Sequence, residues 1–363
     1  MRSLAITIIS VVLLQLSCKD KGTEPPLPLK NPREYTWTID TLAYPGSFQT
    51  AMRDIWGSSP TDVYVVGHND RGFGKMFHYD GKEWKPVGLN YPIEGGAIEG
   101  PIDLSAIYGF SKNDIWAVGK RIDINPNPPP HFLDSSLIIH FDGKQWRDQT
   151  ILRGRSLWSI SGSAPNDIWT CGTDGTLYHF DGNTWRRGSV VVSVPTDGSF
   201  LLWDIQAKSP SEVYMIGNVT QNALARITTF FLMRKNGEWS LVDSFFTEPG
   251  RIAVKFGQNG LWVSPEGTLY SFGPHIFRWT GSSWVKVYET LDALKKMAGT
   301  SERNMFAVGI LGKILHYNGI DWYEFKELRN PNAVYSSVWT DGKEVFVAGF
   351  FNDGSKTLIL HGR

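Results

Sequence analysis

The sequence has little cysteine and no excess of charge of either sign. Of its 363 residues only Cys18 and Cys171 are cysteines, and 36 basic residues balance 36 acidic ones. No basic run resembles the footprint of a nucleic-acid-binding protein, so a nucleic-acid partner is not expected. The chain is 41% hydrophobic and 13% aromatic, which is too apolar for disorder and enough for a large folded unit.

A hydrophobic run long enough to cross a bilayer comfortably is also missing. The apolar stretch near the N-terminus, "LAITIISVVLLQL", has 13 residues, which suits a signal peptide rather than a membrane span. It leads into Ser17-Cys18, which resembles the bacterial lipobox, although Gln15 replaces the usual branched aliphatic residue. The resemblance implies a lipoprotein signal peptide over residues 1–17 and a lipid on Cys18. The alternative is an ordinary secretory signal cleaved near Ser17, with Cys18 incidental.

A lipid on Cys18 would connect the protein to a membrane. Several acyl chains anchor stably, since each buried methylene contributes ~0.8 kcal/mol. The Pro-rich stretch 18–33 then predicts a partly extended tether. Lys19 after the Cys, by resemblance to enterobacterial lipoprotein sorting, favours the outer membrane. We therefore expect a monomer anchored in the bacterial cell envelope, with no intramolecular disulfide because Cys171 has no partner.

The chain does contain a phrase that occurs seven times. Six clear copies of its first half, as in "DIWAVG" (114–119), start at Asp62, Asp114, Asp167, Glu212, Asn304 and Glu344. Its second half, as in "IIHFDGKQW" (138–146), ends in a Trp at 84, 146, 185, 239, 284 and 322, and a seventh, worn copy covers 260–284. The spacing is typical of propeller blades, which repeat every 40 to 50 residues or so.

Each copy predicts four short antiparallel strands, and their count predicts how the ring closes. β-branched and aromatic runs alternate with turn residues, and "DG" between two aromatic-rich runs favours a tight hairpin. The last copy ends after its third strand, 356–362, whereas residues 34–42 form an orphan strand containing Trp37. We expect 34–42 to complete the seventh blade, which also removes an exposed edge. The prediction is an all-β, seven-bladed β-propeller over residues 34–363.

The most chemically suggestive residues are repeated, so we interpret them as scaffold. His179 occupies the same register as His78, His140, His316 and His361. A site occurs once, whereas a structural contact occurs in every blade, so we expect these histidines to hydrogen-bond nearby backbone or Asp groups. A ring of imidazoles around a metal is the rival interpretation, but third strands lie far from the axis. Cys171 occupies a slot filled by Val, Ile or Ala in other copies and should be a small buried hydrophobe.

Functional residues are expected where the copies differ. Long insertions fall only between strands two and three (120–136, 218–228) and between strand four and the next blade (88–103, 187–200). In a four-stranded blade these connections emerge on one face, which we call the insertion-rich face. Rigid scaffolds present binding groups on such loops. The candidate ligand-binding residues are Tyr91, Glu94, Glu99, His131, Asp134, Arg155, Asp197 and Arg226. No catalytic residue, metal site or cofactor is predicted.

The repeat resembles those of bacterial secreted and lipid-anchored propeller proteins of the WD40/kelch-like superfamily. The resemblance covers nearly all of 34–363 and implies architecture rather than activity. Kelch blades would need a Gly-Gly pair per repeat and WD40 blades a closing Trp-Asp, and neither recurs. Two hypotheses follow: a lipid-anchored scaffold that binds a protein or glycan, or a propeller enzyme acting on saccharides (a hydrolase, a lyase or a protein of the glycosyltransferase-labelled type).

Overall fold

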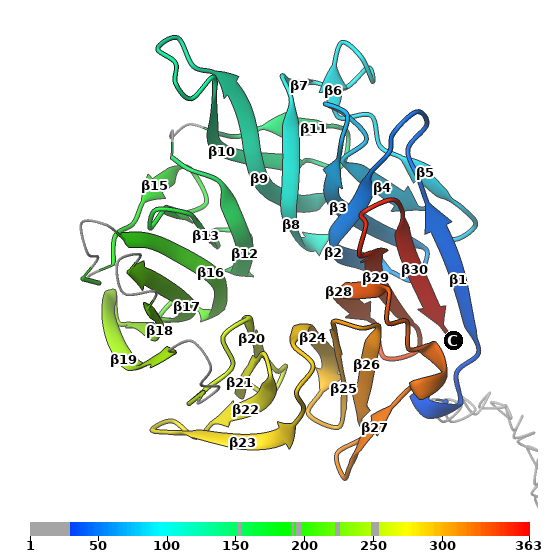
Figure 1. The fold of residues 1–363 in the computed structure, drawn as a ribbon, viewed down its shortest axis with the longest axis vertical. Coiled ribbons are helices and arrows are strands. Elements are labelled where there is room, and N and C mark those ends of the chain that lie inside the picture. Colours follow the sequence, from blue (N-terminus) through cyan, green and yellow to red (C-terminus); the bar gives the residue numbers. More distant parts are fainter. Residues whose placement is uncertain (1–29, 151–153, 191, 194–197, 222–225, 248–253) are drawn as a thin grey trace, which may run out of the picture.

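Seven four-stranded antiparallel sheets surround a central axis, as the view in Figure 1 shows. This computed structural model describes residues 30–150, 154–190, 192–193, 198–221, 226–247 and 254–363. The predicted signal peptide and Cys18 lie outside these residues, as do most of the tether and Asp197. The predicted all-β, seven-bladed propeller is confirmed.

Each blade is built from consecutive strands, apart from the last. Blade 1 consists of β2 (Thr50–Ser59), β3 (Asp62–Asn69), β4 (Met76–Tyr79) and β5 (Trp84–Pro86). Blade 2 consists of β8 (Ile102–Ser111), β9 (Asp114–Ile124), β10 (Phe132–Phe141) and β11 (Trp146–Asp148). Blade 3 consists of β12 (Leu157–Ala164), β13 (Asp167–Gly172), β14 (Leu177–Phe180) and β15 (Trp185–Arg187). Blade 4 consists of β16 (Gly198–Ser209), β17 (Glu212–Gln221), β18 (Arg226–Lys235) and β19 (Glu238–Thr247).

The remaining blades are 5, 6 and 7. Blade 5 consists of β20 (Gly260–Val263), β21 (Leu269–Phe272), β22 (His275–Trp279) and β23 (Trp284–Glu289). Blade 6 consists of β24 (Leu294–Ser301), β25 (Asn304–Gly309), β26 (Lys313–Tyr317) and β27 (Trp322–Glu324). Blade 7 consists of β28 (Ala333–Thr340), β29 (Val345–Phe351), β30 (Thr357–Gly362) and β1 (Trp37–Leu42). Outside the blades lie the parallel pair β6 (Asn90–Tyr91) and β7 (Ile98–Glu99) and the 3-10 turns η1 (Pro32–Glu34) and η3 (Lys326–Leu328).

The first described strand closes the ring, as predicted. β1 pairs with β30 along its whole length, from Trp37 opposite Gly362 to Leu42 opposite Thr357, and the two lie side by side in Figure 1. Pairing satisfies backbone groups that an open edge would leave to solvent or to another protein. Trp37 also packs edge-on against Phe325 of blade 6, with ring centroids 5.3 Å apart.

The hydrophobic core lies between blades rather than within one. Seven clusters of buried side chains each join two neighbouring blades. In blades 1 to 6 the Trp that follows the turn between strands three and four contributes to this contact. Trp185 of blade 3, for example, packs edge-on against Trp116 of blade 2 at 5.7 Å, and Trp239 of blade 4 against Trp169 of blade 3 at 5.9 Å. Aromatic pairs in this geometry stabilise beyond their buried area.

Two of the predicted insertions consist largely of lengthened blade strands. The segment 120–136 continues the β9–β10 hairpin as far as the pair Phe132 and Ile124, which projects from the ring in Figure 1. Residues 218–221 and 226–228 likewise belong to β17 and β18, with Asn218 paired to Thr229. β-branched residues in both segments favour pairing with the facing strand. The prediction of loops at these positions was therefore only partly correct.

Candidate functional site

Each of the five repeated histidines contacts a polar side chain of its own blade, as expected. Their imidazole Nε2 atoms lie within hydrogen-bond distance of the first residue of the "DIWAVG" phrase, 2.7 Å in the His179–Asp167 pair and 2.8 Å in the His140–Asp114 pair. The same rings stack on the aromatic residue two positions further on, for example His140 on Trp116 with centroids 3.9 Å apart. No group of three or more potential metal ligands exists among the described residues.

Cys171 is fully buried, as the repeat predicted, and its Sγ lies 3.5 Å from the Leu202 carbonyl oxygen. Burial raises the pKa of this thiol well above its usual value. The thiol is therefore inert at neutral pH.

The innermost strand of six blades contains a β-bulge that turns one extra residue toward the axis. The six bulge residues are Arg53, Ser105, Trp158, Trp203, Lys295 and Ser336. The Gly that ends each phrase on the next strand permits the bulge, since a Cβ at Gly119 would lie 2.0 Å from the Asp103 carbonyl oxygen. All six residues line a cavity of about 130 Å³ on the axis, to which Asn259 of blade 5 also contributes.

A network of buried charges lies behind these bulge residues. Asp54 accepts hydrogen bonds from Ser337 Oγ at 2.6 Å and from the Ile107 backbone N–H at 3.0 Å, and it lies 3.3 Å from Lys296 Nζ. It therefore links blades 7, 2 and 6 to its own blade 1.

Asp204 does the same on the opposite side of the axis. It accepts from Ser159 Oγ at 2.5 Å and from the Leu261 N–H at 2.7 Å, which connects blades 3 and 5 to blade 4. Burial raises the pKa of Asp204, whereas the charge of Lys296 acts in the opposite direction.

A second cavity, of about 460 Å³, adjoins the axial one. The two share Trp203, Asn259 and Lys295 in their walls. The second cavity extends from the axis between blades 4 and 5 and reaches Ile227 and Thr247 on the insertion-rich face. Its volume falls within the range of small-ligand and peptide side-chain pockets.

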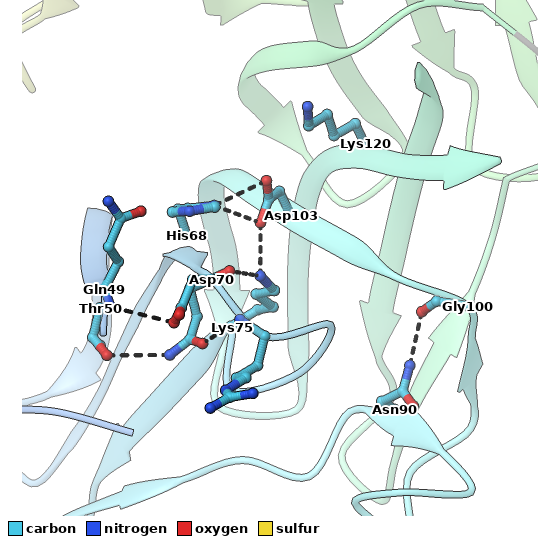
Figure 2. Close-up of polar contacts among 12 residues, drawn as sticks. Gln49, Thr50, His68, Asp70, Lys75, Asn90, Gly100, Asp103 and Lys120 are labelled. Atoms are coloured by element: carbon cyan, nitrogen blue, oxygen red, sulfur yellow. Dashed lines mark hydrogen bonds and ion pairs between the residues drawn. The ribbon is translucent and has the colours of Figure 1, made fainter. Parts of the chain in front are cut away.

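His68 and Lys75 of blade 1 form a cluster with Asp103 of blade 2 on the same face (Figure 2). Asp103 Oδ1 is 2.9 Å from Lys75 Nζ and 3.0 Å from His68 Nδ1. Lys75 is 3% exposed, and its burial lowers its pKa, an effect that Asp103 opposes. Burial raises the pKa of Asp103, but the hydrogen bond with His68 and the positive charge of Lys75 hold it below its ordinary value. No sequence pattern marks this cluster, because its members come from two blades and match no repeat position.

The described candidate residues all lie on the insertion-rich face, but the structure does not gather them into one site. Asp134 and Arg155 line a common cavity of about 510 Å³ beside blades 2 and 3. Asp134 pairs with Lys120 at 3.0 Å, and Arg155 pairs with Asp174 at 3.1 Å.

The other candidates are spread along the face. Glu94 accepts backbone hydrogen bonds from Asn90 in its own loop and from Gly74 in the β3–β4 loop, each at 3.0 Å, and so connects the two loops. Arg226 lies over the Phe246 ring at 4.7 Å. The remaining described candidates, all exposed, are Tyr91, Glu99 and His131. A binding role for any of these residues stays a prediction.

Exposed apolar side chains gather on this face as well. Of 15 large hydrophobic residues exposed in the described part of the protein, nine belong to its connections or strand ends: Phe48, Tyr91, Ile93, Ile124, Phe132, Ile227, Phe246, Leu291 and Leu311. The largest hydrophobic exposure on the opposite face is that of Ile320, in the turn between β26 and β27. The face with more exposed apolar side chains is the better candidate for an interaction surface.

Two further cavities lie between blades and away from the axis. One, of about 490 Å³, is bounded by Tyr270 of blade 5 and Met305 of blade 6, and the other, of about 360 Å³, by Tyr64 of blade 1 and Trp146 of blade 2. Both are lined largely by repeat positions, so we interpret them as clefts of the scaffold. No helix in the described part of the protein has the length and hydropathy needed to cross a membrane.

The protein is a seven-bladed β-propeller in which each blade corresponds to one sequence repeat. No protein-family model matches the sequence, and no curated protein matches it. Among solved structures it is similar to "YCF48 bound to D1 peptide", with 14% identity, a TM-score of 0.57, and coverage of 92% of this chain and 97% of that one. It is also similar to YCF48 from Cyanidioschyzon merolae, with 13% identity, a TM-score of 0.54, and coverage of 88% and 98%. At such identities the likeness concerns the fold.

Proposed function

We propose that this protein is a non-catalytic scaffold that holds a protein partner on its insertion-rich face. The observation that carries the proposal is the asymmetry between the two faces. The insertion-rich face has the axial cavity, the cavity between blades 4 and 5 and most of the exposed apolar side chains. The opposite face has only short turns among the described residues. A similar propeller has been solved with a bound peptide, which supports a protein segment as the ligand.

The β9–β10 hairpin offers the sharpest test of this face. Its end carries Ile124 and Phe132, which are 81% and 63% exposed. The matched control is Ile320, 86% exposed but on the opposite face. We expect Ile124→Ser with Phe132→Ser to reduce cross-linking of the partner in native envelopes, and Ile320→Ser to leave it unchanged. Equal capture by both variants and the native protein would contradict a role for the hairpin.

Lipid anchoring through Cys18 is part of the proposal. It is supported by the apolar stretch ending in Ser17-Cys18 and by the polar, Pro-rich residues that follow. The anchor would keep the propeller at a membrane of the cell envelope, the outer membrane by the sorting argument. Cys18→Ser should abolish metabolic labelling by a palmitate analogue and move the protein out of the detergent phase. Labelling that persists in this variant would refute the anchor.

The alternative of a saccharide-directed enzyme is separable by one assay. Among the candidate carboxylates that the structure describes, Asp134 is the one that lines a cavity, next to Arg155. Turnover of a glycan that is lost in Asp134→Asn would overturn the scaffold proposal. A glycan that binds without turnover would instead support a scaffold with a saccharide ligand.

A further inference from the structure

We propose that the axial cavity is a carboxylate-binding subsite for the partner. The inference rests on the proposed function and specifies part of it. The carboxylate could come from an acidic side group or from the C-terminus of the partner polypeptide, since both present the same anionic group.

Two cations at the cavity, the half-buried Arg53 and the exposed Lys295, form no direct ion pair within the described residues. No described residue forms a hydrogen bond or ion pair with the side chain of Arg53 or Lys295, although both occupy bulge positions that line the cavity. Burial lowers the pKa of Arg53, and only Asp103 acts in the opposite direction. An anion bound at the axis would offset this unfavourable burial of charge.

The carboxylates of the cavity wall are already occupied. Asp54 and Asp204 each accept hydrogen bonds from neighbouring blades, and Asp54 also pairs with Lys296. Three cations (Arg53, Lys295 and Lys296) and two carboxylates line the cavity. The charge of the nearby Asp103 also acts on Arg53, but Asp103 is already paired with Lys75 and His68. The lining itself therefore carries a net positive charge. The site favours an anion over a cation, and a metal ion is disfavoured by the same count.

The size and walls of the cavity select the ligand. A volume of about 130 Å³ admits a carboxyl group but is well below the ~300 Å³ of a small-molecule pocket. Trp158 and Trp203, with ring centroids 5.7 Å apart, form part of the wall, and the other lining residues are almost all polar or charged, which suits a charged group. The adjoining cavity between blades 4 and 5 offers space for the rest of the peptide.

Small peptides can test the subsite without knowledge of the partner. The probes are acetyl-Gly-Glu-Gly-amide, acetyl-Gly-Gly-Gly with a free carboxylate, and neutral acetyl-Gly-Gln-Gly-amide. The full-length protein with Cys18→Ser is labelled with ¹⁵N-tryptophan, and the indole resonance of Trp158 is assigned from Trp158→Phe. We expect a saturable shift of this resonance with a carboxylate probe and not with the neutral peptide. The tighter of the two carboxylates identifies the source.

Variants then separate the subsite from the general proposal. Arg53→Gln should weaken carboxylate binding roughly tenfold or more, because a hydrogen bond to a charged group is lost. Arg53→Lys should restore part of the affinity, and Lys343→Gln, on an exposed turn of the opposite face, should change nothing. Shifts as large with the neutral peptide, or binding unaffected by Arg53→Gln, would overturn the subsite. Partner capture that depends on the hairpin but not on Arg53 would also overturn it and leave the proposed function intact.

Discussion

Protonation of His316 should cost this protein stability in mild acid. His316 is 1% exposed and donates its Nε2–H to Asn304 Oδ1 at 3.0 Å, where other blades place Asp or Glu. Its Nδ1 is buried and has no hydrogen-bond partner among the described atoms. Burial lowers the pKa of His316 to about 4, with a smaller contribution from the positive charge of Arg33.

The size and sign of the effect follow from the two pKa values. The pKa of His316 is 6.5 in the unfolded protein and about 4 in the folded protein. This difference corresponds to roughly 3 kcal/mol of unfolding free energy. The fold favours the neutral ring, so this stability is fully present above pH 6.5. It is lost progressively as pH falls toward 4, because the unfolded state takes up the proton first.

The substitution Asn304→Asp should remove most of this loss. It gives the imidazolium the carboxylate that His179 and His140 have, so the pKa of His316 should rise toward its ordinary value. The assay is urea unfolding of the native protein and the variant at intervals from pH 7 to pH 4, with the difference between the two curves as the readout. Asn332→Asp, at an exposed position, controls for the added charge. If both proteins lose the same free energy between pH 6.5 and 4, the reasoning about His316 is wrong.

Three further predictions concern the scaffold. Gly119→Ala should lower the free energy of unfolding by roughly 1–3 kcal/mol, because its Cβ would lie 2.0 Å from a backbone oxygen of the adjacent strand; thermal unfolding beside Gly72→Ala, whose nearest contact is 3.8 Å, checks this, and equal melting temperatures would contradict it. A variant starting at Ala43 lacks β1 and should aggregate or melt earlier than one starting at Lys30, since the β30 edge is then unpaired; identical melting and light scattering would refute closure by β1. Cys171, the sole thiol of the Cys18→Ser protein, should react with an aromatic disulfide reagent only after unfolding, and fast labelling of the native protein would show that the thiol is accessible.

Most of the scaffold could be predicted because the same sequence pattern occurs in seven copies. The His179–Asp167 hydrogen bond, the burial of Cys171 and the Trp185 contact each follow from positions that recur at a fixed offset. The repeat pattern did not predict the structure of the segments that lengthen individual copies. The residues before and after the tip of the β9–β10 hairpin are strand rather than loop, because local pairing extends a hairpin without any change in the repeat.

The sequence by itself determined the number of blades, the strand order within a blade and the closure of the ring, because local periodicity and turn chemistry specify each hairpin. Only the tertiary structure showed which side chains meet at the axis. Arg53, Trp158 and Lys295 are separated by more than a hundred residues from one to the next, and they share a cavity because each occupies a bulge that the facing Gly makes possible. Convergence of this kind depends on how the blades are arranged around the axis, and no local pattern in the sequence records it.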